Sequence, residues 1–383
     1  MNDEVRVTGL DPARDRAPVD RAQRSGHYGG RGSSQGTHTR RDGRFDAAAV
    51  GTDLYGPTYA ALDLGTNNCR LLVARATHDG FRVIDAFSRI IRLGGGITAS
   101  GRLGEPAIGR AIEVLKICRD KMRNRGVTRT RLIATEACRL AQNGINFLDR
   151  VRADVRIDLE IVDRETEALL AATGCTPLID AESESVILFD IGGGSTEIAH
   201  LARSQACHRG PPEPNMRGWI SLPVGVVTLA ERHGGIAVTR EIFEAMIAEV
   251  AGHVAPFARE HGGRDPRTMH LLGTSGTVTT IAGVHLGLRR YDRRRVDGCW
   301  MMDAQVTDVV ERLLAMSYDE RIDNACIGAE RADLVLAGCA ILEAIRRVFP
   351  SERLRVADRG LREGMLVQMM RADGVWRDGS AAW

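Results

Sequence analysis

The chain has 383 residues, more than the roughly 250 to 300 that one hydrophobic core usually organises, so two domains are expected. Apolar residues make up an ordinary 43% of the chain, and no apolar run approaches the roughly 18 residues that span a bilayer. The formal net charge of +2 argues against a membrane-surface protein and against specific nucleic-acid binding. The N-terminus lacks an apolar signal-peptide core, which favours a cytoplasmic protein.

Polar segments are predicted at both ends of the chain. Residues 1–55 contain few large apolar side chains and many Gly, Ser, Arg and Asp, so they cannot bury enough surface to offset their ordering entropy. We expect a disordered N-terminal tail over 1–55 and a short C-terminal tail over 373–383. The eight cysteines are scattered, without the close pairs of zinc or redox sites, and are interpreted as small buried side chains.

From Tyr59 onward, apolar runs alternate with turn-forming residues. The runs YAALDL, CRLLVARAT and FRVIDAFSRIIRL predict three consecutive strands. The elements after them alternate between helix and strand: helix 105–125, strand 131–135, helix 145–155, strand 159–163 and a helix after Asp163. This βββαβαβα order is typical of one α/β unit with a mixed sheet.

The same order of elements then starts again. Aligning Asp63 with Asp190 places LDLGTNNCRLLVA over FDIGGGSTEIAHL without a gap. Downstream, the strand WISLPVG, a helix over 239–260, the strand MHLLGTSG running into a helix, long helices through Val348, and the strand LRVAD before a last helix repeat the pattern. We therefore predict an α/β protein with two copies of one fold, 56–180 and 181–372, that face each other.

Each copy has a tight glycine turn after a strand that ends in an aspartate. Such a turn exposes backbone N–H groups in a concavity suited to phosphate oxygens. The candidate phosphate-binding residues are Gly65, Thr66, Asn67 and Asn68 beside Asp63, and Gly192, Gly193, Gly194 and Ser195 beside Asp190. A hairpin without a ligand explains either turn alone. Two related loops, each beside an aspartate, favour a phosphate site.

Carboxylates near phosphate loops suggest magnesium, because Mg²⁺ prefers a few carboxylate oxygens together with substrate phosphate. Asp190 and Glu197 are the metal candidates, since they lie on opposite sides of the second turn. Asp63 is a third contributor, either directly or through water. The alternative role of each aspartate is to stabilise its turn, which Asp beside Gly commonly does.

Hydrolysis also needs a carboxylate that takes a proton from the attacking water. Glu167, in the segment DRETEALLA at the start of a helix, is the candidate base, although acids at helix starts also interact with the helix dipole. Arg92 and Arg139, at strand or loop ends, are candidates for clamping phosphates, and a solvated surface role is the alternative. Ser275 stands between a strand and a helix start, a position favourable to anions.

Several segments, taken in order, resemble the exopolyphosphatase/guanosine pentaphosphate phosphohydrolase (Ppx/GppA) family within the actin-like ATPase superfamily. They are DLGTNNCRLLVA, ATEACR, EIVDRETEALLA, FDIGGGSTEI, LPVGVVTLAE, GTSGT, YDRRRVDG and ADRGLREGML, and the resemblance covers about residues 58–370. It implies two RNase H-like domains with an interdomain cleft, and magnesium-supported release of the terminal phosphate of inorganic polyphosphate or guanosine pentaphosphate. It also implies a homodimer.

The family's functional residues carry over onto matching positions. Its catalytic glutamate falls on Glu167, its acidic ligands on Asp190 and Glu197, and the arginine before the second helix on Arg139. The two phosphate loops fall on 63–68 and 192–195. Family members often have two adjacent glutamates where this chain has Thr166 and Glu167, so Glu165 is an alternative base.

Other functions remain open at this point. A sugar kinase of the same superfamily needs an adenosine pocket and an aspartate base for its acceptor, whereas this chain offers Glu167 and no clear acceptor site. A catalytically weak regulatory module that binds nucleotides such as guanosine tetraphosphate would not need the acids Glu167 and Glu197. Polyphosphate and guanosine pentaphosphate end in the same phosphoanhydride, and the sequence does not choose between them.

Overall fold

The computed structural model describes residues 56–203 and 209–376. The tail predicted over 1–55, residues 377–383 of the tail predicted over 373–383, and Cys207 lie outside the described residues. Six of the seven described cysteines are buried, as predicted, and Cys299 is half-buried. None of the described helices combines the length and the apolar character that crossing a membrane requires.

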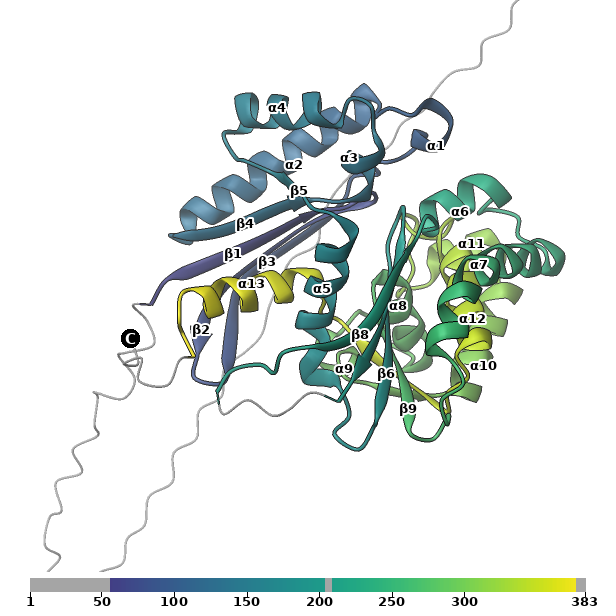
Figure 1. Cartoon of the computed structure of the whole chain (residues 1–383). Helices are drawn as coiled ribbons and strands as arrows, with labels where there is room; N and C mark the ends of the chain where they lie inside the picture. The colour runs from purple at the N-terminus through teal and green to yellow at the C-terminus, as the bar shows by residue number, and fades with distance from the viewer. Residues whose placement is uncertain (1–55, 204–208, 377–383) are drawn as a thin grey trace, which may run out of the picture. The chain divides into compact units, whose positions relative to one another are not determined.

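The first half of the chain forms a five-stranded mixed sheet with the strand order β3-β2-β1-β4-β5. Its strands are β1 (Thr58–Leu64), β2 (Asn68–Thr77), β3 (Gly80–Ile90), β4 (Arg129–Ala134) and β5 (Glu160–Ile161). Its connecting helices are α1 (Ile97–Ser100), α2 (Glu105–Asn124), α3 (Glu136–Leu140) and α4 (Gly144–Val155). The central strand β1 pairs antiparallel with β2 and parallel with β4, and α2 and α4 cover one face of the sheet (Figure 1).

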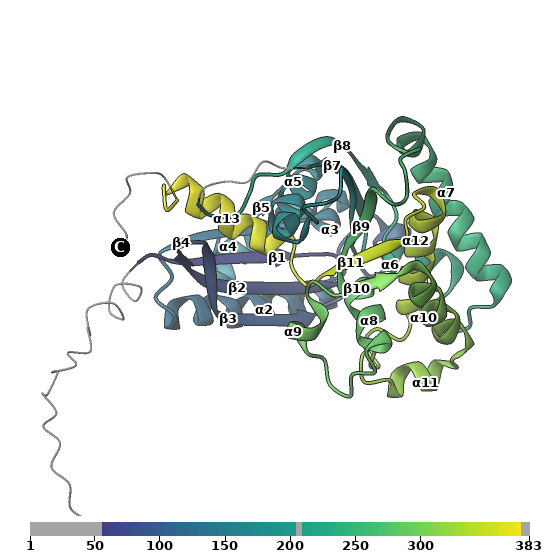
Figure 2. The ribbon, with the colours of Figure 1, turned by 90° about the horizontal axis from the view of Figure 1, so that it is seen from below.

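The second half forms a six-stranded sheet with the order β10-β11-β9-β6-β7-β8. Its strands are β6 (Ser185–Ile191), β7 (Thr196–Ala202), β8 (Asn215–Leu222), β9 (Met269–Thr274), β10 (Trp300–Met302) and β11 (Arg353–Ala357). The helices are α6 (Val226–His233), α7 (Arg240–His261), α8 (Gly276–His285), α9 (Arg293–Val296), α10 (Asp303–Ala315), α11 (Tyr318–Asp323) and α12 (Val335–Val348). Apart from the edge strand β10, the order β8-β7-β6-β9-β11 repeats that of the first sheet. The predicted α/β class with two βββαβαβα halves is confirmed, and Figure 2 shows the strands of both sheets.

The apolar run of β1 follows from burial on both faces of the first sheet. Ala60, Leu62 and Leu64 pack into the core formed with α2 and α4. Tyr59 and Ala61, with the opposite parity, pack into a second core formed with helix α13 (Leu361–Ala372). Because successive side chains of a strand point to opposite faces, a strand covered on both sides reads as a continuous apolar run.

Two helices are exchanged between the halves. Helix α5 (Arg164–Cys175), expected to close the first copy, packs Ala172 and Cys175 against the second sheet, and the last helix, α13, packs against the first sheet (Figure 1). Glycines permit the close crossing, since a Cβ at Gly174 would lie 2.0 Å from Gly360 O and one at Gly364 would lie 1.9 Å from Leu170 O. The crossing joins both sheets, and the exact boundaries of the predicted domains stay predictions.

The end of α13 is fixed to the first sheet. Tyr59 Oη donates to Asp373 at 3.0 Å, and Arg129 forms an ion pair with the same carboxylate. Trp376 Nε1 donates to the carbonyl of Thr77 at 2.9 Å. The described part of the predicted C-terminal tail therefore packs against the fold.

Candidate active site

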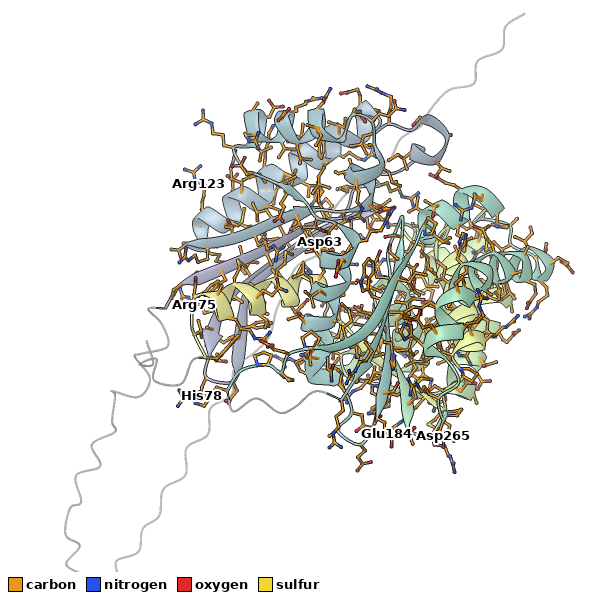
Figure 3. All side chains as sticks on the ribbon, viewed as in Figure 1. Asp63, Arg75, His78, Arg123, Glu184 and Asp265 are labelled. Atoms are coloured by element: carbon orange, nitrogen blue, oxygen red, sulfur yellow. The ribbon has the colours of Figure 1, made fainter. Side chains whose placement is uncertain are left out.

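The two glycine turns are built alike. Gly65 N donates to Asn68 O at 2.9 Å in the β1–β2 turn, and Gly192 N donates to Ser195 O at 2.9 Å in the β6–β7 turn. The same hydrogen bond at aligned positions supports the internal repeat inferred by aligning Asp63 with Asp190. Figure 3 shows Asp63 at the end of the β1–β2 ribbon that is opposite to His78.

The turns face each other at contact distance. A Cβ at Gly193 would lie 3.0 Å from Thr66 Cβ and 3.2 Å from Asn67 N, and one at Gly194 would lie 2.8 Å from Thr66 Oγ1. Glycine is required at these two positions of the second turn because the first turn fills the space that a side chain would need. The two turns therefore form opposite walls of one cleft.

The backbone of both turns leaves N–H groups free. Asn67 O accepts from Ile91 N at 2.8 Å, and Gly193 O accepts from Val227 N at 2.8 Å, so neighbouring segments satisfy the carbonyls. Among the described residues, no acceptor is present for the backbone N–H groups of Thr66, Asn67, Gly193 and Gly194. Such free N–H groups are suited to bind phosphate oxygens.

Thirteen of the fifteen residues predicted for the site line this one cleft. They are Asp63, Gly65, Thr66, Asn67, Asn68, Glu167, Asp190, Gly192, Gly193, Gly194, Ser195, Glu197 and Ser275. The cleft encloses about 120 Å³, which is several times the space that one water molecule needs. It continues into a second cavity that shares Asp63, Asp190 and Ser275 with it. The roles predicted for these residues stay predictions.

Buried carboxylates form one side of the cleft. Asp190 on β6 and Glu197 on β7 are directly opposite each other in the strand register, and Glu197 is only 4% exposed. Burial raises the pKa of Asp190 to about 6. Burial, together with the charge of Asp190, raises the pKa of Glu197 to about 7, although hydrogen bonds from Ser195 and Ser221 oppose this. The pKa of Asp63 is also raised by burial. The negative charges of these neighbouring carboxylates also repel one another.

Glu167 lies in the first turn of α5 and lines the same cleft. Burial raises its pKa well above the usual 4.5, Glu197 adds to the shift, and Arg139 opposes it. A raised pKa suits a group that takes a proton near neutral pH. Glu165, the alternative base, is exposed and does not line the cleft. The structure thus brings Glu167, and not Glu165, to the phosphate turns.

Neither predicted arginine clamp lines the cleft. Arg92 has a φ of 47° and forms a two-bond ion pair with Asp333, at 2.9 and 3.0 Å, which links the first half of the chain to the second. Arg139 contacts the proposed base instead, since its Nη2 donates to Glu167 Oε2 at 3.0 Å. Ser275, with a φ of 120°, caps α8 by accepting a hydrogen bond from Thr277 N.

Sequence reasoning missed two arginines that do line the cleft. A Cβ at Gly276, the first residue of α8, would lie 3.8 Å from Arg331 Nη1 and 3.9 Å from Arg70 Nη2, so both guanidinium groups gather at this helix start. Among the described residues, neither guanidinium group has an ion-pair or hydrogen-bond partner, although the backbone N–H of Arg331 donates to Gly328 O. When the two repeats are aligned, Arg70 occupies the position that Glu197 has in the second repeat. This local pattern could have indicated that Arg70 lies in the cleft. Arg331 follows no turn motif.

The residues of the cleft fit a magnesium ion chemically. No group of three or more His, Cys, Asp or Glu side chains in the described parts of the chain encloses a metal by itself. However, the buried Oδ1 atoms of Asn67 and Asn68 have no hydrogen-bond partner there, and they share the cleft with the carboxylates. Mg²⁺ accepts such oxygens and usually keeps water and substrate phosphate as its remaining ligands.

Two opposed N–H turns, a carboxylate cluster and unpaired arginines in one cleft define a phosphate-handling protein of the α/β class. The sequence pattern of the Ppx/GppA phosphatase family matches residues 72–373, and the chain belongs to this family. The resemblance noted from the motifs is thereby confirmed.

Known relatives agree with this assignment. A guanosine-5'-triphosphate,3'-diphosphate pyrophosphatase of Aeromonas hydrophila is 26% identical over 315 residues, which are 82% of this chain and 60% of the relative, so this chain spans about three-fifths of that protein's length. The crystal structure of the Aquifex aeolicus member of the Ppx/GppA family is 27% identical, with a TM-score of 0.68 over 83% of this chain and 98% of that chain. An exopolyphosphatase of Cytophaga hutchinsonii, 24% identical, shares the fold with a TM-score of 0.72 over 83% of this chain and 98% of its own.

Proposed function

We propose that the protein is a phosphohydrolase that releases the terminal phosphate of inorganic polyphosphate, guanosine pentaphosphate, or both. The observation that carries the proposal is the position of Glu167, a half-buried carboxylate that lines the same cleft as the two N–H turns. Both substrates present a terminal phosphate on an anhydride bond, and the free N–H groups suit its oxygens. Family membership supports the same reaction class.

In the proposed reaction, the N–H groups of Thr66 and Gly193 bind oxygens of the terminal phosphate from opposite sides. Glu167 accepts a proton from a water molecule as the water oxygen attacks phosphorus. The bond between phosphorus and the bridging oxygen breaks, and the bridging oxygen leaves with the shortened chain. The products are inorganic phosphate and a substrate with one phosphate fewer. Positioning and charge stabilisation account for most of the catalysis in such transfers.

Magnesium would be held by Asp190 and Glu197, with Asp63 as a third contributor. When bound, Mg²⁺ supplies positive charge that neutralises phosphate oxygens. The carboxylates that would hold it have raised pKa values because burial disfavours their charged forms.

Arginines extend the binding site beyond the terminal phosphate. Arg70 and Arg331 line both the first cavity and the second, at the start of α8. Unpaired guanidinium groups bind phosphate oxygens strongly and, where geometry permits, through two bonds. They would hold the second or third phosphate, which polyphosphate and guanosine pentaphosphate both have.

The experiment is phosphate release by the purified protein with magnesium, on long-chain polyphosphate, guanosine pentaphosphate and ATP in parallel. Glu167→Gln should lower kcat by roughly 100-fold or more, because a positioned base contributes about that much. Glu165→Gln is the matched control on the same helix, and its exposed side chain should leave kcat within about twofold.

Two results would contradict the proposal. The first is that the wild-type protein releases no phosphate from any of the three substrates. This result would favour a regulatory nucleotide-binding module instead. Alternatively, Glu167→Gln could retain full activity, which would remove Glu167 from the reaction.

A further inference from the structure

A buried carboxylate, that of Glu136, binds the same guanidinium group as the proposed base. Glu136, the first residue of α3, is only 2% exposed and has three N–H partners. Its Oε2 accepts from Arg139 Nε at 2.9 Å and from Arg139 Nη2 at 2.5 Å, and its Oε1 accepts from Arg164 Nη2 at 2.7 Å. Glu136 is not among the residues predicted for the site, although it lines the cleft.

The bonds of Glu136 fix the plane of the Arg139 guanidinium. Arg139 also donates from Nη1 to Val162 O at 2.5 Å and from Nη2 to Glu167 Oε2 at 3.0 Å. A guanidinium has five N–H bonds, and four are used here: Nε–H, both on Nη2 and one on Nη1. A group so fully occupied by protein acceptors has little capacity left for clamping phosphate.

Arg139 in turn fixes one oxygen of the base. It binds Oε2 of Glu167, while Oε1 of Glu167 accepts no hydrogen bond from any residue in the described parts of the chain. A carboxylate held at one oxygen presents the other in a defined direction. The free oxygen is the one available to a water molecule in the cleft.

Glu136 also contacts the opposite phosphate turn. A Cβ at Gly194 would lie 3.1 Å from Glu136 Cγ, so the side chain of Glu136 packs directly against the second turn. The position of the base relative to the second phosphate turn therefore depends on the side chain of Glu136.

We propose that Glu136 is a positioning residue, which holds Arg139 so that its guanidinium aims Glu167 at the attacking water. This inference rests on the proposed phosphohydrolase function. Arg139 then serves the base instead of clamping a phosphate. The arrangement extends the reactive site by two residues that act through Glu167.

The structural test is a crystal structure of the Glu136→Gln variant. Glutamine keeps the shape of the side chain but places an NH₂ group, or an uncharged oxygen, against two guanidinium groups. We expect Arg139 to turn away, with its bond to Glu167 lost. A bond that remains at about 3 Å in the variant would overturn the proposal, whatever the activity of the protein.

The kinetic test is a double-mutant cycle with Glu136→Gln and Arg139→Met. Misplacing a catalytic group by about 1 Å can cost 100-fold, so each single variant should lower kcat by about 10- to 100-fold while KM changes less than about threefold. The double variant should be no worse than Arg139→Met within about threefold, because Glu136 acts through Arg139. Effects that multiply, or an unchanged kcat in Glu136→Gln, would refute the positioning role.

The two proposals fail in different ways. A wild-type protein without phosphate release would refute the proposed function, and the crystal structure of Glu136→Gln would still decide whether Glu136 positions the pair. A wild-type protein that loses activity with Glu167→Gln, but not with Glu136→Gln, would keep the function and refute the positioning role.

Discussion

The repelling carboxylates of the cleft predict that removing one negative charge stabilises the protein without metal. Glu197 has its pKa raised from 4.5 to about 7 by burial and by the neighbouring Asp190. A group whose pKa is higher in the folded protein than in the unfolded protein contributes its full stabilisation at a pH below its pKa in the unfolded protein. This contribution is lost as the pH rises through its pKa in the folded protein. The protein without metal should therefore lose stability between about pH 4.5 and pH 7 as Glu197 ionises.

The magnitude follows from the shift. A difference of about 2.5 pKa units at roughly 1.4 kcal/mol per unit gives about 3–4 kcal/mol at pH 8, an upper value because neighbouring carboxylates share the titration. Glu197→Gln keeps an oxygen that can accept the 2.8 Å hydrogen bond from Ser221 Oγ and cannot ionise. We expect the variant to unfold about 3–8 °C above the wild type at pH 8 in EDTA, and at the same temperature near pH 4.5.

The assay is thermal unfolding of both proteins across this pH range, first in EDTA and then in magnesium chloride. Magnesium should raise the midpoint of the wild type more than that of the variant, since the variant loses a proposed ligand. Glu363→Gln is the matched control, because Glu363 is equally buried at 4% but accepts from Arg293 Nη2 at 2.9 Å and from Gly360 N at 3.0 Å. The Glu363→Gln change should destabilise the protein. A Glu197→Gln variant that unfolds at or below the wild-type midpoint at pH 8 in EDTA would refute the reasoning.

Two further predictions concern the ion pair that links the two halves of the chain and an exposed glycine in helix α7. If Arg92 acts only through its ion pair with Asp333, Arg92→Met and Asp333→Asn should change KM by the same factor. The double variant should then have the same KM as either single variant. A change in KM confined to Arg92→Met would instead support the predicted phosphate contact of Arg92. The free energy of unfolding should fall by less than about 1 kcal/mol in either, because the pair is partly exposed. Gly252→Ala, in the exposed middle of α7 where a Cβ would meet nothing within 4 Å, should raise the free energy of unfolding by about 0.5–1 kcal/mol in denaturant titration, and a loss would show hidden strain.

The sequence predicted the cleft well because its residues are local to turns. A strand that ends in aspartate and turns through glycine places the aspartate, the turn N–H groups and the next strand within a few residues. Aligning Asp63 with Asp190 therefore located both walls at once. The repeated hydrogen bond from Gly65 to Asn68 and from Gly192 to Ser195 shows why the alignment worked.

The sequence could not predict features that depend on contacts between distant segments. Arg331 reaches the cleft from the segment before α12, and no nearby motif distinguishes it from the other arginines of this arginine-rich chain. The exchange of α5 and α13 depends on the crossing of Gly174 with Gly360, which are 186 positions apart (360 − 174). Arg92 was predicted to clamp phosphate, but its side chain pairs with Asp333 and does not line the cleft.

The repeat also explains why the cleft combines guanidinium and carboxylate groups, which the proposed binding of phosphate and magnesium needs. Cross-strand partners Asp63 and Arg70 in the first half occupy the positions of Asp190 and Glu197 in the second half. Each half contributes one N–H turn and one aspartate, but the seventh residue after the aspartate is a guanidinium in one half and a carboxylate in the other. In the proposed function, the guanidinium side would bind phosphate oxygens and the carboxylate side would bind magnesium. Replacing Arg70 with glutamate would therefore make both sides acidic, and should weaken phosphate binding more than a neutral Arg70→Met change does.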